Sequence, residues 1–260
     1  MPAPEDDLAL LIDAARQAGA IACRYVGATA KRWDKPDNAG PVTEADLAVN
    51  DLLLRELRGA RPDYGWLSEE TEDNADRLSQ DRVFIVDPID GTRSFVAGED
   101  TWAHSLAVTE AGEVTAAVVY LPMRDMLYAA SRGGGSTLNG APIRSSTLTD
   151  LGEATVLAAR PALVAERWHG GEPPVFKRSY RPSLAYRMAL VADASFDAMI
   201  TLRRTWEWDI AAGTLIVNEA GGICTTTKGG PVRFNNPDPR IDGIVAGGPA
   251  IQAALIDALA

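Results

Sequence analysis

Apolar residues recur at helical spacing near the start of the chain. Leucines, alanines and isoleucines follow this spacing over about residues 6–26, which predicts a first helix. Residues 31–42 are rich in Asp, Asn, Gly and Pro and predict a loop. Thr43 then opens a second predicted helix, which runs to about residue 57.

Short apolar runs separated by turn signals occupy the middle of the chain. Residues 84–86 are β-branched and aromatic, end at a proline, and predict a buried strand. Runs at 105–109, 115–120 and 126–130 predict a β-meander. Asn139-Gly140 predicts a further tight turn, and residues 155–159 a further strand.

The C-terminal part mixes both periodicities. Residues 184–193, 210–220 and 249–259 predict helices, and 223–226 and 243–245 predict strands. Because helices and strands do not alternate strictly, the pattern favours a layered α+β fold over a doubly wound sheet. The polar stretch 144–150 suggests a boundary between an N-terminal α+β subdomain (residues 1–147) and a C-terminal α/β subdomain (residues 148–260).

Composition narrows the functional classes. Of the 260 residues, 46% are hydrophobic and no run of about twenty is apolar, so we expect no stable membrane insertion. The net charge of −11 argues against a nucleic acid polymer as partner. The N-terminus lacks signal-peptide features, and two cysteines make no disulfide framework. We therefore expect a cytoplasmic protein with Cys23 and Cys224 as core thiols.

The segment that begins at Asp87 carries the main candidate chemistry. Asp87 follows the predicted strand, and the next residue, a proline, is expected to end the ladder. Asp90 comes three residues after Asp87, so a turn can aim both carboxylates at one point and leave the Ile89 carbonyl facing a cation. Gly91 and Thr92 follow with backbone N–H groups at a predicted helix start, which suits a phosphate.

Further acidic residues lie at the ends of other predicted elements. They are Glu69 in Glu69-Glu70, Asp46 beside Thr43, and Asp209 directly before a predicted helix. All are oxygen donors, and the chain has only two histidines, which favours Mg²⁺ over Zn²⁺. Phosphomonoester hydrolysis requires a barrier lowered by roughly 20 kcal/mol, and two metal ions held by three or four carboxylates suit that task.

Taken singly, these motifs favour structural interpretations. Asp-Pro-x-Asp-Gly is a common turn, Glu69-Glu70 resembles a solvated surface pair, and Thr43-x-x-Asp46 resembles a helix capping box. His104 and the two tryptophans before Asp209 are interpreted as packing residues. The functional interpretation rests on the occurrence of all the acidic motifs in one chain.

Four motifs occur in order along nearly the whole chain. They are Gly40-Pro41-Val42-Thr43-Glu44-Ala45-Asp46, Ser68-Glu69-Glu70, Val86-Asp87-Pro88-Ile89-Asp90-Gly91-Thr92-Arg93-Ser94-Phe95, and Trp208-Asp209-Ile210-Ala211-Ala212-Gly213 with Glu219-Ala220-Gly221-Gly222. In these the chain resembles the inositol monophosphatase superfamily. The resemblance implies an αβαβα sandwich of the inositol monophosphatase and fructose-1,6-bisphosphatase type. It also implies a Mg²⁺-dependent, lithium-sensitive phosphatase that acts on a small phosphorylated substrate and forms a homodimer.

The resemblance assigns metal ligands position by position. Glu69, Asp87 and the Ile89 carbonyl would hold a first Mg²⁺, and Asp87, Asp90 and Asp209 a second. Asp87 would thus bridge the two ions, and Glu69 would also serve a third, weaker one. The expected cofactor is therefore two or three Mg²⁺ ions per site.

The resemblance also assigns the reacting groups. Gly91 and Thr92 would bind the phosphate through backbone N–H groups. Thr92 and Asp46 would orient or deprotonate the attacking water, with assistance from Glu69.

Three segments resemble the 3'(2'),5'-bisphosphate nucleotidase branch often called CysQ. They are Lys35-Pro36-Asp37-Asn38, Glu207-Trp208-Asp209, and Arg181-Pro182-Ser183-Leu184-Ala185-Tyr186-Arg187, in which Ala185 replaces a lysine of that branch. The implied reaction converts adenosine 3',5'-bisphosphate to AMP and phosphate, with Glu207, Asp209 and Arg187 among the substrate-binding residues. Candidates for holding the 5'-phosphate are Arg181, Arg187, Lys177 and Arg178.

Two alternatives stay open. The chain could hydrolyse inositol 1-phosphate or histidinol phosphate instead. A more distant alternative is a non-catalytic protein that binds a phosphate ligand, although such proteins usually lack one of the metal carboxylates, and Glu69, Asp87, Asp90 and Asp209 are all present here.

Overall fold

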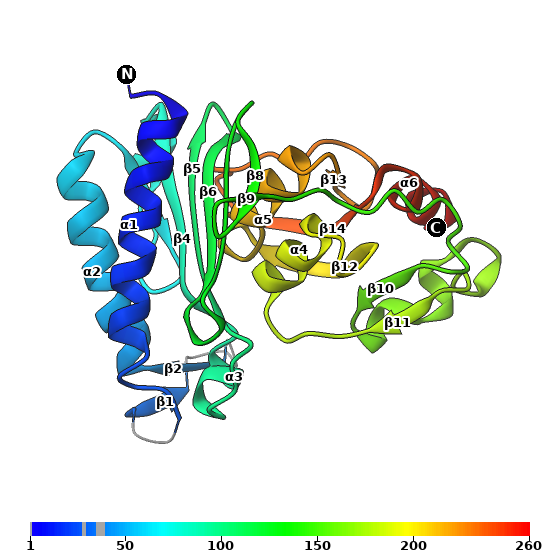
Figure 1. Cartoon of the computed structure of the whole chain (residues 1–260), viewed down its shortest axis with the longest axis horizontal. Helices are drawn as coiled ribbons and strands as arrows, with labels where there is room; N and C mark the ends of the chain where they lie inside the picture. Colours follow the sequence, from blue (N-terminus) through cyan, green and yellow to red (C-terminus); the bar gives the residue numbers. More distant parts are fainter. Residues whose placement is uncertain (1, 28–29, 35–39) are drawn as a thin grey trace.

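Helices and sheets alternate as layers in the order αβαβα in the computed structural model of the chain (Figure 1), which describes residues 2–27, 30–34 and 40–260. Within these residues the helices are α1 (Pro4–Ala22), α2 (Glu44–Ala60), α3 (Thr92–Val96), α4 (Leu184–Ala192), α5 (Glu207–Glu219) and α6 (Pro249–Ala258). The layered α+β fold predicted from the sequence is therefore confirmed.

A seven-stranded sheet forms the second layer, with α1 and α2 on its outer face. Its strands, in spatial order, are β3 (Gly65–Ser68), β4 (Arg82–Asp90), β5 (Ala103–Glu110), β6 (Glu113–Leu121), β7 (Met126–Ser131), β8 (Gly135–Leu138) and β9 (Ala141–Pro142). β3 and β4 are parallel and the remaining pairs are antiparallel. The predicted β-meander is thus confirmed as β5, β6 and β7.

The first helices show why the outer layer packs closely. α1 begins at Pro4 with three acidic residues in its first turn, where they complement the helix dipole. Its buried face carries Leu11 and several alanines, so the helix can approach both α2 and the sheet closely. Thr43 caps α2, as its sequence predicts.

A second sheet of five strands forms the fourth layer. Its spatial order is β11 (Lys177–Ser179), β10 (Thr155–Ala158), β12 (Ala198–Trp206), β14 (Arg240–Gly247) and β13 (Ile223–Thr225). α6 covers its outer face, where Ile251 and Leu255 are fully buried.

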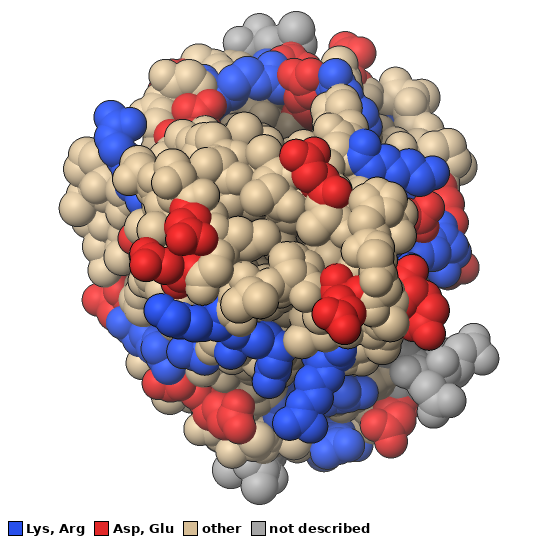
Figure 2. Space-filling view, turned by 90° about the vertical axis from the view of Figure 1, so that its right-hand side faces the viewer, with Lys and Arg blue, Asp and Glu red and all other residues tan. Residues whose placement is uncertain are grey.

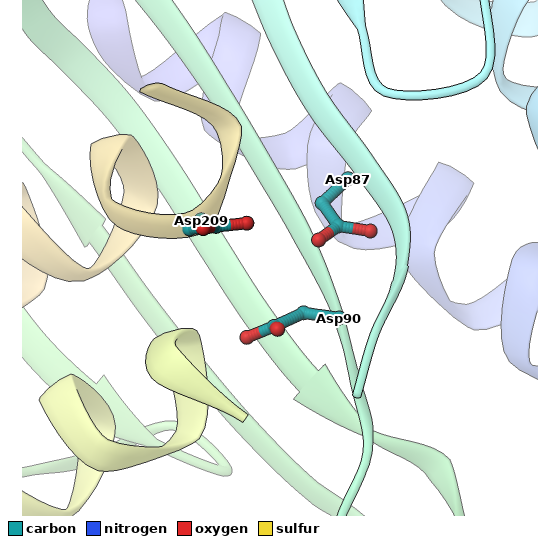
Figure 3. Close-up of side chains that lie close together, drawn as sticks. All are labelled: Asp87, Asp90 and Asp209. Atoms are coloured by element: carbon teal, nitrogen blue, oxygen red, sulfur yellow. The ribbon is translucent and has the colours of Figure 1, made fainter. Parts of the chain in front are cut away.

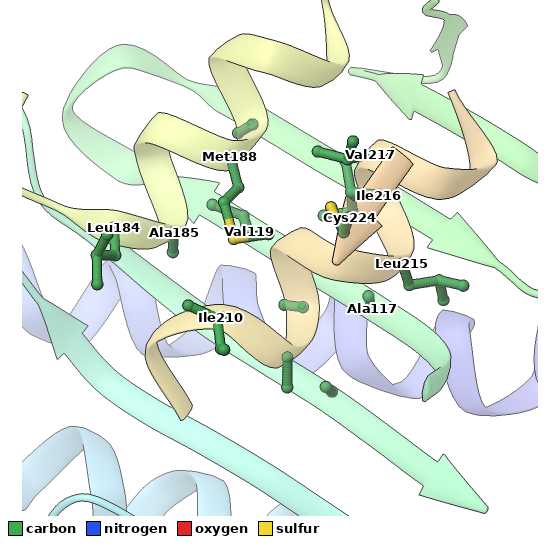
Figure 4. Packing of buried hydrophobic residues seen from close by; sticks show 14 of the residues in the cluster. Ala117, Val119, Leu184, Ala185, Met188, Ile210, Leu215, Ile216, Val217 and Cys224 are labelled. Atoms are coloured by element: carbon green, nitrogen blue, oxygen red, sulfur yellow. The ribbon is translucent and has the colours of Figure 1, made fainter. Parts of the chain in front are cut away.

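Helices α4 and α5 lie between the two sheets and share one apolar core with both. Figure 4 shows Val119 of β6 beside Met188 of α4, and Ala117 of β6 beside Leu215 of α5. The core continues to the second sheet through residues such as Met199. Both faces of the central strands are therefore covered, which explains why β5 and β6 are buried almost without interruption.

Three sequence predictions are wrong in detail. The stretch 31–42, predicted as a loop, contains an antiparallel pair, β1 (Arg32–Asp34) and β2 (Pro41–Thr43). β12, at the centre of the second sheet, was not predicted, because two arginines interrupt its apolar run. Cys23 was predicted in the core but is exposed, since it lies just beyond the C-terminal end of α1, whereas Cys224 is buried as predicted.

None of the helices in the described residues is long and apolar enough to cross a membrane.

Candidate active site

Three carboxylates converge between the two sheets. Asp87 and Asp90 belong to β4 and Asp209 to the first turn of α5, and each has an oxygen within 4.8 Å of oxygens of the other two. Figure 3 shows the three side chains directed at a common space. The structure thus brings together three of the predicted metal ligands, although Asp209 is far from the other two in sequence.

An irregularity in β4 positions the first two carboxylates. Asp87 pairs with Ser105 and Asp90 with Ala103, so two residues of β4 lie opposite the single residue between these partners on β5. This is a β-bulge, and bulges can re-aim side chains next to active sites. The prediction that Pro88 ends the strand is wrong: β4 continues to Asp90, because the proline lies within the bulge, where the ladder is already disrupted.

Asp90 is held by the N-terminal end of α4. The Ser183 hydroxyl donates to Asp90 Oδ2 at 2.6 Å, and the Ala185 N–H donates to the same oxygen at 2.7 Å. Ser183 also caps α4 by accepting from the Tyr186 N–H. A segment remote in sequence therefore orients this carboxylate.

Asp209 lies inside α5, not before it as predicted. The helix begins at Glu207, so Asp209 is in the first turn, where the helix dipole favours a carboxylate. The Thr205 hydroxyl donates to Asp209 Oδ2 at 2.9 Å. The Ser105 hydroxyl of β5 donates to the Trp208 carbonyl at 2.8 Å and ties this turn to the first sheet.

Asp46 is fixed by a capping box at the start of α2. Its Oδ2 accepts from the Thr43 N–H at 2.8 Å and the Thr43 hydroxyl at 2.6 Å. Its other oxygen faces Thr92, whose hydroxyl lies 3.4 Å from Asp46 Oδ1 and 3.1 Å from the Ile89 carbonyl. The capping box predicted from Thr43-x-x-Asp46 is confirmed, and it places Asp46 beside the segment that carries Asp87 and Asp90.

The start of α3 lies where the sequence predicts it. Gly91 precedes Thr92 with φ of +97°, a left-handed conformation that glycine adopts readily. Both residues line the cavity described below. Their binding of phosphate stays a prediction.

Burial and mutual repulsion disfavour the charged form of the clustered carboxylates. Burial raises the pKa of Asp87 well above its usual range, and Glu69, Asp90 and Asp209 raise it further. Burial is also the main cause that raises the pKa of Asp90 to about 6 and that of Asp209 to about 8. Such a group of oxygen donors fits a hard divalent cation, which would compensate the buried negative charge.

One cavity joins this cluster to a basic wall. Its volume is about 520 Å³, and Glu69, Asp90, Gly91 and Thr92 are among the residues that line it. Four arginines from several elements, which form the arginine wall, line it as well: Arg93, Arg167, Arg187 and Arg203. Figure 2 shows the wider context, a band of Lys and Arg side chains across the lower half of the end of the molecule formed by the second sheet and α6.

Sequence reasoning assigned no role to three of these arginines. Arg167 lies in a 3₁₀ turn (Ala165–Arg167), Arg203 on the unpredicted strand β12, and Arg93 in α3. Predicting residues 198–206 as a strand leading to Asp209 would have indicated Arg203.

Of the predicted candidates for a second phosphate, Arg187 lines the cavity and stacks over the Tyr180 ring at 4.4 Å. The other three candidates are not among the described residues that line the cavity: Lys177, Arg178 and Arg181. Arg178 donates to the Ala158 carbonyl, and Arg181 lies over the Phe196 ring.

The structure contradicts the prediction that Glu207 binds substrate. Its side chain is fully buried and accepts hydrogen bonds from the backbone N–H groups of Asn235 and Asn236 and from the Asn236 side chain. It therefore anchors the loop before β14, and it is not among the described residues that line the cavity. The predicted motif Lys35-Pro36-Asp37-Asn38 lies outside the described residues.

Comparison with known proteins agrees with this geometry. The model of the inositol monophosphatase family matches residues 4–260. An inositol-1-monophosphatase of Mesorhizobium japonicum is 33% identical over 97% of this chain and 95% of its own. The Nus factor SuhB of Escherichia coli (strain K12) is 32% identical over 96% and 94%.

Solved structures show the same likeness. The IMPase of Thermotoga maritima superimposes with a TM-score of 0.83 at 29% identity, over 97% of this chain and 96% of that one. The family match spans nearly the whole chain and includes every carboxylate of the cluster. The chain therefore belongs to the inositol monophosphatase family and is a phosphatase.

Proposed function

We propose that the chain is a Mg²⁺-dependent 3'(2'),5'-bisphosphate nucleotidase that removes the 3'-phosphate of adenosine 3',5'-bisphosphate. The observation that carries this proposal is that one cavity is lined both by carboxylates and by four arginines. A scissile phosphate on a metal centre accounts for the carboxylates. The arginines suit a second anionic group on the substrate, which inositol 1-phosphate does not have.

The charges of the arginine wall support the nucleotidase proposal. The positive charge of Arg203 lowers the pKa of two neighbours, Asp209 and Arg187. The side chains of Arg93, Arg167 and Arg203 have no hydrogen-bond or ion-pair partner among the described residues, so a phosphate is not competing with an existing carboxylate.

The remaining walls of the cavity suit a nucleoside. Ala159, Pro161 and Leu202 supply apolar surface. Tyr180 lines the same cavity with 47% of its surface exposed, and Arg187 lies over one face of its ring. Aromatic faces of this kind stack on bases.

We infer the division of labour among the residues as follows. The carboxylates of Glu69, Asp87, Asp90 and Asp209, with the Ile89 carbonyl, would hold two or three Mg²⁺ ions. Bound Mg²⁺ supplies positive charge that stabilises the phosphoryl group during displacement.

The protein's own groups prepare the attack. Asp46 and Thr92 lie within hydrogen-bond reach of one another, so they can orient a water and accept its proton beside the phosphate. The N–H groups of Gly91 and Thr92 would hold the phosphate, and the lining arginines, Arg187 included, the second anionic group.

Phosphate release from adenosine 3',5'-bisphosphate, inositol 1-phosphate and histidinol phosphate tests the proposal, each with Mg²⁺ and with added Li⁺. We expect kcat/KM to be highest for adenosine 3',5'-bisphosphate and Li⁺ to inhibit. The named relatives make inositol 1-phosphate the second candidate, and a preference for it in kcat/KM would contradict the nucleotidase proposal.

One pair of variants tests the arginine wall directly. Arg203→Gln should lower kcat/KM for the bisphosphate by about 10- to 100-fold, the effect of losing a charge-assisted hydrogen bond, with little change for a monophosphate. Arg204→Gln is the matched control, because the neighbouring Arg204 pairs with Asp238 and Asp242 instead. Equal effects of the two variants would remove the role given to Arg203.

A further inference from the structure

His104 is the residue that faces the β-bulge of β4. Pro88 and Ile89 lie between the paired residues Asp87 and Asp90, and His104 alone lies between their partners on β5. A bulge leaves a residue of the strand outside the regular ladder. Its backbone groups then need another partner, because buried polar groups left unpaired are costly.

The side chain of His104 supplies that partner. Its Nδ1 makes a short contact with the Pro88 carbonyl oxygen, which can only accept, so Nδ1 carries the proton. The ring is fully buried, and its Nε2 has no hydrogen-bond partner among the described residues. Burial lowers the pKa of His104 to about 4, consistent with a neutral imidazole that donates through Nδ1.

Aromatic neighbours fix the orientation of the imidazole ring. The Trp102 ring meets it edge-on at 5.5 Å between centroids, and the Tyr120 ring lies at 6.3 Å. A ring held in this way directs Nδ1 at one point, so the bond to Pro88 is imposed by the packing around it.

The next residue of β5 performs a similar task on the opposite face of the sheet. Side chains alternate along a strand, and Ser105 donates to the carbonyl of Trp208, directly before Asp209. Consecutive residues of β5 therefore anchor the backbone next to Asp87 and next to Asp209. A histidine with only a packing role would not need its Nδ1 donor at this carbonyl.

We infer that His104 is a positioning residue for the metal centre. Its hydrogen bond to the Pro88 carbonyl holds the bulge in the form that brings Asp87 and Asp90 together. The inference rests on the metal centre of the proposed function but not on the identity of the substrate. Groups that orient metal ligands typically change metal affinity by about 10- to 100-fold when they are removed.

Two variants of similar polarity separate positioning from packing. In His104→Asn the side-chain amide nitrogen is attached at the same carbon as Nδ1 and can still reach the Pro88 carbonyl. In His104→Gln the amide lies one bond further out, and in His104→Val the donor is absent. The readout is the affinity for Mn²⁺, titrated by calorimetry without substrate, beside kcat and Tm.

We expect His104→Asn to bind Mn²⁺ nearly as the unchanged protein does, and His104→Gln and His104→Val to bind it about 10- to 100-fold more weakly. Ser136→Ala is the matched control, because it removes a buried hydrogen bond from β8 of the same sheet to the Ile216 carbonyl of α5, about two helical turns from Asp209. This control should lower Tm and leave Mn²⁺ affinity unchanged.

The outcomes are distinguishable. Folded His104→Gln and His104→Val with unchanged Mn²⁺ affinity would overturn the role of His104. Equal losses in His104→Asn and His104→Gln would assign the effect to packing and would overturn it as well. If Asp87→Asn also leaves Mn²⁺ binding unchanged, the metal centre itself is wrong, and the proposed function fails with it.

Discussion

At the scale of single residues, each carboxylate of the cluster is oriented by a different part of the chain. Asp87 accepts from the Ile89 N–H at 2.9 Å, Asp90 from Ser183 and Ala185, and Asp209 from Thr205. These bonds fix the carboxylate directions before any cation arrives. Such preorganisation reduces the reorganisation that binding would otherwise require.

Replacing Asp87 by Asn should separate activity from stability. We expect kcat to fall by about 10²- to 10³-fold, since the central carboxylate of the proposed metal centre is lost. The Tm of the metal-free protein should rise, because a carboxyl group whose ionisation is opposed by burial and by its acidic neighbours is replaced by a neutral amide. Initial rates and thermal unfolding in EDTA measure both effects.

Asp7→Asn is the control for that experiment. Asp7 is fully buried and pairs with Arg61 and Arg82, remote from the cluster. Breaking a buried pair costs about 3–5 kcal/mol, so this variant should lose stability and keep its kcat. An Asp87→Asn protein with an unchanged rate would contradict the mechanism.

At the scale of elements, the crossing of α4 and α5 depends on one glycine. A Cβ at Gly213 of α5 would lie 2.5 Å from the Met188 Cβ of α4, closer than two carbons can approach. The small residue therefore lets the two central helices come close, and α5 carries Asp209 between the sheets.

Two glycine substitutions should change the free energy of unfolding in opposite directions. Gly213→Ala should lower the free energy of unfolding by about 1–2 kcal/mol, because overpacking exceeds the gain in helix propensity. Gly59→Ala in α2 should raise it by up to about 1 kcal/mol, since a Cβ at Gly59 would meet no atom of the described residues outside its own helix within 4 Å. Urea unfolding of both variants measures the difference, and two changes of the same sign would contradict the packing argument.

Elements and ligands with local signals could be predicted from the sequence. Thr43 as a cap, the strands of the meander and the motif from Asp87 to Thr92 are specified by neighbouring residues. β12 was missed, because two arginines interrupt its apolar run and its pairing with the distant strands β10 and β14 leaves no local signal. Arg167 and Arg203 were missed for the same reason: the wall they line exists only once distant segments pack together.

At the scale of the whole molecule, the acidic cluster lies between two sheets that share one apolar core. Its raised pKa values therefore act on global stability. Asp90 and Asp209 titrate near 4 when unfolded, but near 6 and 8 in the folded, metal-free protein. Because folding raises these pKa values, the protonated forms of Asp90 and Asp209 stabilise the folded state. This contribution to the free energy of unfolding is fully present below about pH 4 and is lost as pH rises through the folded pKa values.

Thermal unfolding across pH 5 to 8, measured once in EDTA and once in Mg²⁺, should reveal this dependence of stability on pH. We expect the Tm gained on adding Mg²⁺ to grow as pH rises over about this range, since the metal competes with protons for the same oxygens. The difference between the two curves removes the contributions of surface carboxylates such as Asp238. A gain in Tm that is independent of pH would contradict the assignment of these groups as ligands.

The bond from Ala185 to Asp90 spans 95 positions of the chain. A nascent chain leaves the ribosome N-terminus first, so Asp87 and Asp90 emerge long before the helix that orients one of them and the helix that brings Asp209. We therefore expect metal loading to be a late event of biosynthesis. A prematurely terminated chain would keep the most recognisable motif of the protein and still be catalytically silent.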